Sequence, residues 1–177
     1  MTVLKLSGKI LWQHVLSCVL ALFGMYVFSW LLVMDNGYLI YACLFTYIYA
    51  VMIYSTAWNF GRLDARNIPG CYPDFQKMSR VAAVSAVPSI VLLCTRVISP
   101  FVFDELTVNI IDIIYRAWVF PCIGFISMGE KFSAYVLPIF IIPVFTMLGY
   151  FVGLKKFSII EKLYPKIVYK REKRDIK

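Results

Sequence analysis

Charge is scarce in this chain. Only 16% of its 177 residues are Asp, Glu, Lys or Arg, whereas a soluble domain carries about 25%. Apolar residues make up 61% of the sequence, and the mean hydropathy is +0.76. This composition excludes an ordinary soluble domain. It predicts an all-α integral membrane protein, a single domain with room for about four spans, because each span takes about 20 residues.

The sequence also lacks the motifs of the common catalytic and metal sites. It has no H-E-x-x-H pair, no glycine-rich phosphate loop, no Ser-His-acid set and no paired acids at catalytic spacing within an apolar stretch. The single histidine, His14, has no second histidine or nearby carboxylate in sequence, so we expect a packing or interfacial residue and not a metal ligand. Only Arg96 could lie within a span, near its outer edge, which argues against ion-coupled transport. We therefore expect no cofactor, no metal and no enzymatic activity.

The five cysteines form no C-x-x-C pair. Within apolar stretches, cysteine behaves as a small apolar side chain. Cys94 and Cys122 fall toward the same side of the predicted bundle, so a disulfide between them is left open.

Four long apolar stretches predict four membrane-spanning helices. Asn36-Gly37 predicts a tight turn after the first, and Ser99-Pro100 predicts the end of the third, because the residue before proline avoids helical geometry. The first stretch is longer than the apolar core of a signal peptide, so we expect no cleavage there. The predicted spans are residues 11–34, 38–60, 81–97 and 134–152, with a loop at 61–80.

An additional helix is predicted before the last span. Polar residues recur at Glu105, Asn109, Asp112 and Arg116, and their spacing of four, three and four places them on one helix face. This pattern predicts an amphipathic helix at residues 105–118 that lies on the membrane surface or caps the bundle. The alternative is a fifth span with Asp112 and Arg116 paired in the bilayer. That alternative would move the basic tail at 154–177 to the outside.

Lysine and arginine are distributed unevenly between the two sides of the predicted bundle. With four spans, fifteen of the 18 lie on one side, and only Arg96, Arg116 and Lys131 lie on the other. Because positive residues resist translocation, we expect a multi-pass protein of the cell membrane with both termini in the cytoplasm. The net charge of +8 is then an orientation signal and not a nucleic-acid footprint. Membrane lipids are expected partners, with anionic headgroups at the tail.

The second predicted span ends within the stretch from Tyr54 to Arg80, which contains the longest strongly polar interval between two long apolar stretches. One hypothesis places a ligand site here, at the cytoplasmic mouth of the bundle. In it Tyr54 and Trp58 form an aromatic wall, Arg62 binds an anion, and Asp64 and Asn67 orient the ligand. The alternative is that the aromatic residues pack helices, while Arg62 and Asp64 are snorkelling and capping charges.

Two patterns of small residues predict close contact between helices. Ala82 and Ala86 are four apart in the third span, and Gly149 and Gly153 form a literal G-x-x-x-G in the last. Small residues let helix backbones approach closely in lipid. The contact could serve the bundle itself, a homodimer or a partner's helix, and we expect the first.

Several short motifs carry a resemblance to a known group. They are Tyr54-x-x-x-Trp58-x-x-Gly61-Arg62-x-Asp64-x-x-Asn67, Tyr115-Arg116, and Gly149-Tyr150-x-x-Gly153 followed by Phe157-Ser158-Ile159. On these motifs the chain resembles a group of uncharacterised small multi-pass membrane proteins of Gram-positive, clostridia-like bacteria. The resemblance implies a bacterial inner-membrane protein and implies no activity.

These observations leave several hypotheses of function. The first is a non-enzymatic accessory or structural subunit of a membrane complex, held by a protein partner or as a homo-oligomer. The second is a small-molecule or lipid carrier with its site at the cytoplasmic mouth. An enzyme that uses a lipid substrate is the third.

Overall fold

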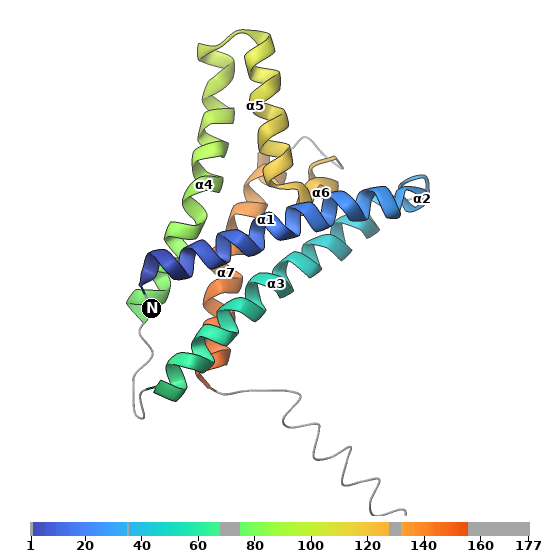
Figure 1. Cartoon of the computed structure of the whole chain (residues 1–177). Coiled ribbons are helices and arrows are strands. Elements are labelled where there is room, and N and C mark those ends of the chain that lie inside the picture. Colours follow the sequence, from blue (N-terminus) through green and yellow to red (C-terminus); the bar gives the residue numbers. More distant parts are fainter. Residues whose placement is uncertain (1, 35, 68–74, 128–131, 156–177) are drawn as a thin grey trace, which may run out of the picture.

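A computed structural model of the chain describes residues 2–34, 36–67, 75–127 and 132–155. Within these residues every regular element is a helix, so the predicted all-α fold is confirmed (Figure 1). In chain order the elements are α1 (Val3–Val27), α2 (Ser29–Leu32), α3 (Gly37–Asn67), α4 (Phe75–Val102), α5 (Glu105–Trp118), the 3-10 helix η1 (Phe120–Cys122), α6 (Ile123–Ser127) and α7 (Phe132–Leu154).

The described part of the chain contains four helices that are long and apolar enough to cross a membrane. They are Val3–Val27 in α1, Gly37–Ala65 in α3, Gln76–Val102 in α4 and Tyr135–Leu154 in α7. Four apolar helices of this kind indicate a multi-pass membrane protein, as the composition predicts. The outward sides of these helices are themselves apolar, as expected for helices that meet lipid.

The boundaries of the predicted spans differ from those of the observed helices in several places. The interval predicted as a loop at 61–80 is helical at both ends, because α3 continues to Asn67 and α4 already begins at Phe75. Leu, Ala, Arg and Lys in these turns are good helix formers, so the helices do not stop where the apolar residues stop. The first predicted span, 11–34, is interrupted at Phe28, which separates α1 from the short α2.

The third helix also continues beyond its predicted end. Pro100 lies inside α4, which ends only at Val102. A proline has no N–H to donate to the carbonyl four residues earlier, here that of Arg96. The Ser99 hydroxyl donates to that same carbonyl over 2.9 Å. This side-chain bond supplies the missing donor, so the helix passes through the Ser-Pro pair that predicted its end.

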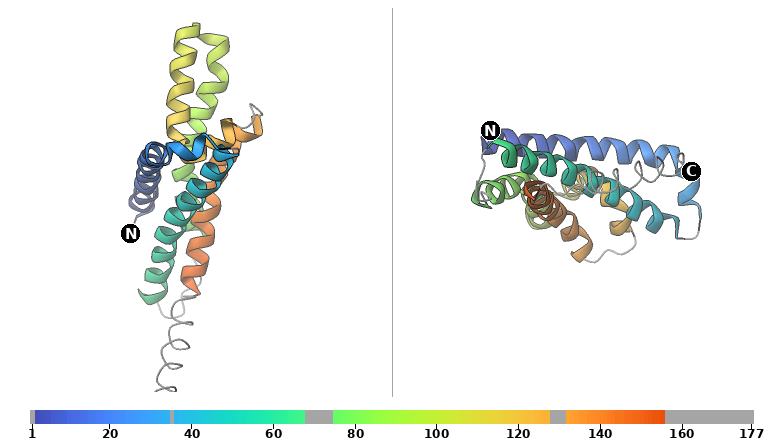
Figure 2. Two further views of the ribbon diagram at one scale, coloured as in Figure 1. Left: turned by 90° about the vertical axis from the view of Figure 1, so that its right-hand side faces the viewer. Right: turned by 90° about the horizontal axis from the view of Figure 1, so that it is seen from below.

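The long helices are arranged around α3 and α7, which pack along each other. α4 packs on α7, and α1 contacts both α3 and α4 (Figures 1 and 2). α1 and α3 converge near α2 and spread apart toward the start of α1 (Figure 1). The largest buried cluster joins these four helices through Leu6, Ile10, Tyr49, Ile53, Met78, Val81, Ile142 and Tyr150.

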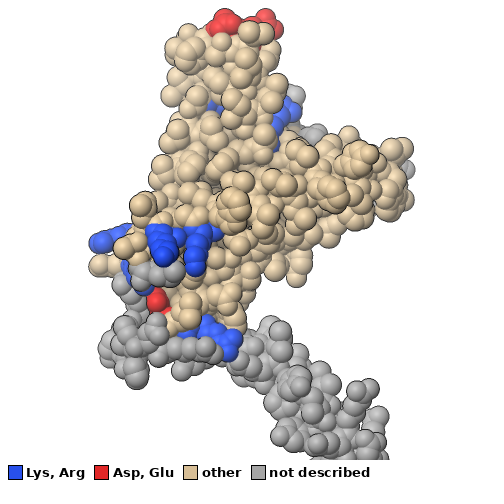
Figure 3. All heavy atoms as spheres, in the orientation of Figure 1, with Lys and Arg blue, Asp and Glu red and all other residues tan. Residues whose placement is uncertain are grey.

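Basic side chains gather at one end of the molecule, where α1 and α4 begin and where α3 and α7 end (Figure 3). Acidic side chains mark the tip of the α4–α5 hairpin at the far end. The helices therefore bring together, at one end of the molecule, the Lys and Arg residues that the sequence places on one side of the predicted bundle. The described basic residues at this end are Lys5, Lys9, Arg62, Lys77, Arg80 and Lys155.

The amphipathic helix α5 has the predicted bounds, Glu105–Trp118, and turns back along the second half of α4 (Figure 1). Asp104 is its N-cap residue, and its carboxylate accepts a hydrogen bond of 2.6 Å from the Thr107 hydroxyl, which lowers the pKa of Asp104. The negative charge of Glu105 in the first turn and the positive charge of Arg116 in the last turn both interact favourably with the helix dipole. The Asp104–Thr107 bond and the end charges thus favour this helix locally, whereas its position beside α4 depends on tertiary contacts.

Part of the apolar surface of α5 is not covered by the described chain. Its exposed apolar side chains lie apart from the exposed polar stripe of Glu105, Asn109 and Arg116. Such a division is typical of an amphipathic helix. Together α5 and the η1–α6 segment satisfy the length and hydropathy criteria of a span, but an 83° bend separates them. The uncovered apolar residues are Leu106, Ile110, Ile113 and Ile114.

Candidate functional site

The residues predicted to form a cytoplasmic-mouth site lie where α3 meets α7. A Cβ atom added to Gly149 would lie 2.4 Å from the carbonyl oxygen of Tyr54, and one added to Gly153 would lie 2.2 Å from that of Trp58. Conversely, a Cβ on Gly61 would lie 2.2 Å from the carbonyl oxygen of Tyr150. Real Cβ atoms do not approach so closely, so the two backbones touch along this seam. Gly149 and Gly153 therefore lie against the chain's own α3.

The small residues of α4 also face the interior. Ala82 and Ala86 are buried, as is Ser85 between them. Nearby, the Ser7 hydroxyl of α1 donates to the Val81 carbonyl over 3.3 Å. Small side chains thus bring α4 close to its neighbours, the arrangement expected for helices that associate in lipid.

Asp64, the predicted orienting carboxylate, ties three helices together. Its Oδ2 atom lies 3.0 Å from Nζ of Lys77 on α4 and accepts a hydrogen bond of 3.1 Å from the Tyr150 hydroxyl on α7. The Arg62 guanidinium lies 5.3 Å from the centre of the Trp58 ring, one turn away on α3, a distance at which a cation is attracted to the ring face. The contacts of Asp64 fasten α3 to α4 and α7 at the basic side of the molecule, whereas the Arg62–Trp58 contact lies within α3.

The five predicted site residues therefore divide between different surroundings. Tyr54 lines an apolar groove of about 370 Å³ on the side of α3 toward α6 and α7, while Asp64 is engaged in the contacts between helices. Asn67 is the last residue of α3, and its side chain lies outside the described part. Besides Tyr54, the groove is lined by Cys43, Thr46, Tyr47, Ala50, Val51, Phe125 and Phe145.

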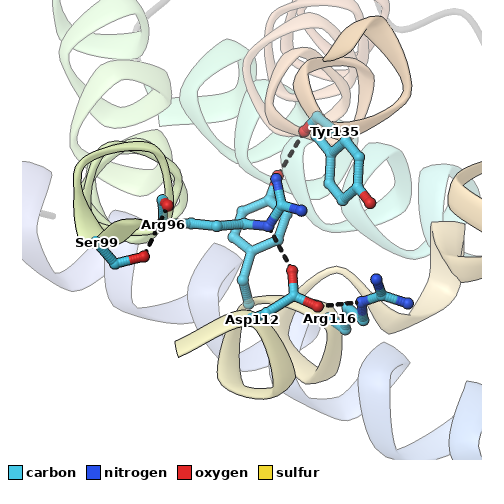
Figure 4. A network of polar contacts seen from close by, with 6 residues as sticks. Arg96, Ser99, Asp112, Arg116 and Tyr135 are labelled. Carbon is cyan, nitrogen blue, oxygen red and sulfur yellow. Dashed lines mark hydrogen bonds and ion pairs between the residues drawn. The ribbon is translucent and has the colours of Figure 1, made fainter. Parts of the chain in front are cut away.

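A second polar cluster, in the α4–α5 hairpin, was not predicted as a site (Figure 4). Nε of Arg96 donates to Oδ1 of Asp112 over 2.5 Å, and Nε of Arg116 donates to Oδ2 over 2.6 Å. The Arg96 guanidinium also lies over the Tyr135 ring of α7, with its carbon 3.7 Å from the ring centre. The Tyr115 hydroxyl of α5 donates to the carbonyl of the same Tyr135. The cluster links α4, α5 and α7.

The electrostatics of this cluster favour the ionised carboxylate. Burial alone would raise the pKa of Asp112, but the hydrogen bonds and charges of Arg96 and Arg116 outweigh it and lower that pKa. The side chains of Arg96 and Asp112 are 23% and 24% exposed, whereas that of Arg116 is 45% exposed. The Arg96–Asp112 bond is therefore the more sheltered of the two ion pairs. The sequence signal for this cluster is the four-residue spacing of Asp112 and Arg116; nothing local in sequence connects Arg96 to them.

A third polar cluster surrounds His14, which is buried at 2% exposure. Its Nδ1 lies 2.8 Å from the Tyr49 hydroxyl, and its ring centre lies 4.4 Å from that of Trp118. The Cys18 thiol donates to the Trp118 carbonyl over 3.1 Å, and Trp118 Nε1 donates to the Ser89 hydroxyl over 2.9 Å. His14 is thus a packing residue that joins α1, α3 and α5. No three His, Cys, Asp or Glu side chains among residues that the structure describes lie close enough to hold a metal ion.

The disulfide that the sequence left open is not formed. Cys94 and Cys122 are both free thiols, the first exposed and the second buried. The Thr46 hydroxyl instead donates to the Cys122 sulfur over 3.5 Å. In this structure Cys122 serves as a small core residue, which is the other role expected for cysteine in an apolar stretch.

Comparison of the chain with family models, with curated proteins and with solved structures finds no match. The group that the sequence motifs resemble therefore remains a prediction. A function for this chain has to be argued from its own contacts.

Proposed function

We propose that this chain is a non-enzymatic accessory or structural subunit of a membrane complex. It would reside in a bacterial inner membrane as a multi-pass protein, with both termini in the cytoplasm. The observation that supports this proposal best is the use of its polar side chains. Asp64, Asp112 and His14 all make contacts between helices.

A catalytic or transport site inside the bundle would leave buried polar groups free to meet a ligand. In the described residues, the hydroxyl of Thr146 is the one buried side-chain polar atom without a hydrogen-bond partner. It is a lone neutral group on α7. Polar residues that fasten a bundle and leave its outer surface apolar are what a scaffold or accessory subunit requires.

The orientation is supported by the charge distribution. The ends of the long helices at the basic side carry Lys and Arg on α1, α3 and α4 (Figure 3). Positive residues next to a span are retained on the cytoplasmic side. Placing this end in the cytoplasm accounts for all of these residues together.

Isolation of the intact complex tests the proposed function. The chain, tagged at one end, would be cross-linked in its native membrane and purified in mild detergent. We expect a species larger than the 20.4 kDa chain that contains a second protein, or further copies of this chain, in a fixed ratio. A protein of unrelated function with the same tag and a similar expression level is the control for adventitious capture. A single copy without a protein partner, in membranes where the cross-linker joins other subunits, would contradict the proposal.

A second candidate function is a carrier for a small apolar molecule or lipid. It is favoured by the groove beside Tyr54, which is apolar and lies on the side of α3 toward α6 and α7. The same purified protein separates the two candidates. A carrier would show a ligand-dependent rise in melting temperature that is lost in Tyr54→Ala, whereas a structural subunit would show a stoichiometric partner and no such ligand.

A further inference from the structure

A groove of mixed polarity lies between α1 and α3, on a different side of α3 from the glycine seam. Its volume is about 410 Å³. It lies where α1 and α3 spread apart, at the end of the molecule where Lys and Arg gather (Figures 1 and 3). Its lining residues are Lys9, Trp12 and Gln13 from α1, and Thr56, Asn59, Phe60 and Leu63 from α3.

The polar lining of this groove is suited to an anionic group. Lys9 provides a cation, with Nζ 5.6 Å from the centre of the Phe60 ring. Gln13 and Asn59 each add a carboxamide that can donate two hydrogen bonds, and neither side chain has a partner in the part of the chain described here. Trp12 is 65% exposed, and an indole of this kind prefers the headgroup level of a bilayer. A cation, two free amides and an indole therefore line one groove.

A second groove lies between the same two helices, nearer to α2. It has a volume of about 430 Å³, and its lining is wholly apolar. It contains no charged or amide side chain, so it offers space only to a hydrocarbon. Its lining residues are Leu20, Phe23, Gly24, Val27, Phe28, Leu44, Phe45 and Ile48.

The two grooves lie along one side of the α1–α3 seam. On α1 they are connected by residues 9, 13, 16, 20, 23 and 27, and on α3 by residues 63, 59, 56, 52, 48 and 45. Steps of three and four residues keep a series on one face of a helix. Because the helices are antiparallel, both series run from the basic end toward α2. A ligand that entered at Lys9 would therefore meet the apolar groove further along the same face.

The distance between the grooves matches the length of a phospholipid acyl chain, which reaches through one leaflet of a bilayer. Lys9 and Leu20 are eleven residues apart, which corresponds to about 16 Å along a helix. The hydrocarbon core of a bilayer is about 30 Å thick, so one leaflet spans about 15 Å. A phospholipid with its phosphate at Lys9 would place the far part of an acyl chain in the apolar groove.

We propose that the α1–α3 seam binds one anionic phospholipid from the leaflet at the basic end of the protein. Lys9 neutralises the headgroup, Gln13 and Asn59 donate hydrogen bonds to its phosphate or ester oxygens, and an acyl chain extends past Leu16 to Leu20 and Phe23. The site is separate from the mouth residues and does not depend on a protein partner, so its failure would leave the proposed function untouched.

Lipid binding to the purified full-length protein tests this inference. The probes are dioleoylphosphatidylglycerol, dioleoylphosphatidylcholine and glycerol 3-phosphate, measured by native mass spectrometry and by melting temperature. We expect one phosphatidylglycerol per chain, with much weaker binding of the zwitterionic lipid and of the free headgroup. Equal binding of phosphatidylcholine, or binding of glycerol 3-phosphate as tight as that of the lipid, would overturn the proposal.

Two pairs of variants locate the site. Lys9→Gln is expected to weaken phosphatidylglycerol binding about fivefold. Lys5→Gln removes the same charge one turn away, at a residue that does not line the groove, and should change binding by less than about twofold. Leu20→Trp should fill the apolar groove and displace the lipid, whereas Leu22→Trp, on the outer side of α1, should not. Equal losses in Lys9→Gln and Lys5→Gln would show diffuse attraction to a basic surface, and unchanged binding in Leu20→Trp would remove the acyl part of the site.

Discussion

Replacing Gly153 by alanine is expected to destabilise the folded protein by about 3 kcal/mol, a large effect for the addition of one methyl group. The new Cβ atom would lie 2.2 Å from the carbonyl oxygen of Trp58 and 3.1 Å from the amide nitrogen of Arg62. Both are backbone atoms of α3, so no side-chain rotation can relieve the contact. The two helices would have to separate along a seam that also contains Gly149 and Gly61.

The measurement is the melting temperature of the purified protein in one detergent, compared with that of Gly8→Ala. Gly8 is inside α1, and a Cβ atom added there would meet no other atom within 4 Å. Alanine is favoured over glycine within a helix by about 0.5–1 kcal/mol, so Gly8→Ala should be neutral or stabilising. Equal melting temperatures for the two variants would contradict the observed contact between α3 and α7.

The second large effect is expected at Arg96. Arg96→Gln should cost about 2 kcal/mol, because it leaves a sheltered carboxylate with one partner and removes the cation that lies over Tyr135. The variant would loosen the α4–α5 hairpin from α7, since Arg96 contacts side chains of both α5 and α7. Thermal unfolding at constant pH and ionic strength measures the loss.

Arg116→Gln is the matched control for this prediction. It removes the same charge from the same carboxylate, but Arg116 is 45% exposed, and exposed ion pairs contribute about 0.2–1 kcal/mol. We therefore expect a clearly smaller loss than in Arg96→Gln. If the two variants unfold at the same temperature, the Arg96–Asp112 pair is not what holds the hairpin.

The sequence predicts the features that depend on neighbouring residues. Four apolar stretches indicate four long helices because the length needed to cross a bilayer can be read directly from hydropathy. The bounds of α5 follow from the three- and four-residue spacing of its polar groups. Close packing at Gly149 and Gly153 can also be predicted from neighbouring residues, because these two glycines leave one face of the helix without side chains.

The features that the sequence does not predict depend on which helix faces meet. Asp64 and Lys77 approach each other because the end of α3 and the beginning of α4 both lie at the basic end, where their side chains form an ion pair. Arg96 and Asp112 are 16 residues apart, and they pair because the chain turns at Asp104. The continuation of α4 through Pro100 depends on a side-chain bond from Ser99, which hydropathy and proline rules do not include.

The burial of His14 shows the same limit. The sequence predicts a packing or interfacial role for His14, because no second histidine or carboxylate lies near it in sequence. The structure adds the partner: the Tyr49 hydroxyl on α3, with Trp118 of α5 against the ring. Because Trp118 is the last residue of the amphipathic helix, its contact with α1 could be predicted only after the hairpin was placed.

Topology labelling tests the central claim most directly: four helices cross the membrane with their basic ends together in the cytoplasm. Single cysteines would replace Lys5, Asp104 and Lys155 in a chain whose native cysteines are alanine, and intact cells would be treated with a membrane-impermeant maleimide. We expect labelling at position 104 in intact cells, and at positions 5 and 155 only after the membrane is opened. Labelling of positions 5 and 155 from opposite sides, or of positions 5 and 104 from the same side, would contradict the four-span arrangement.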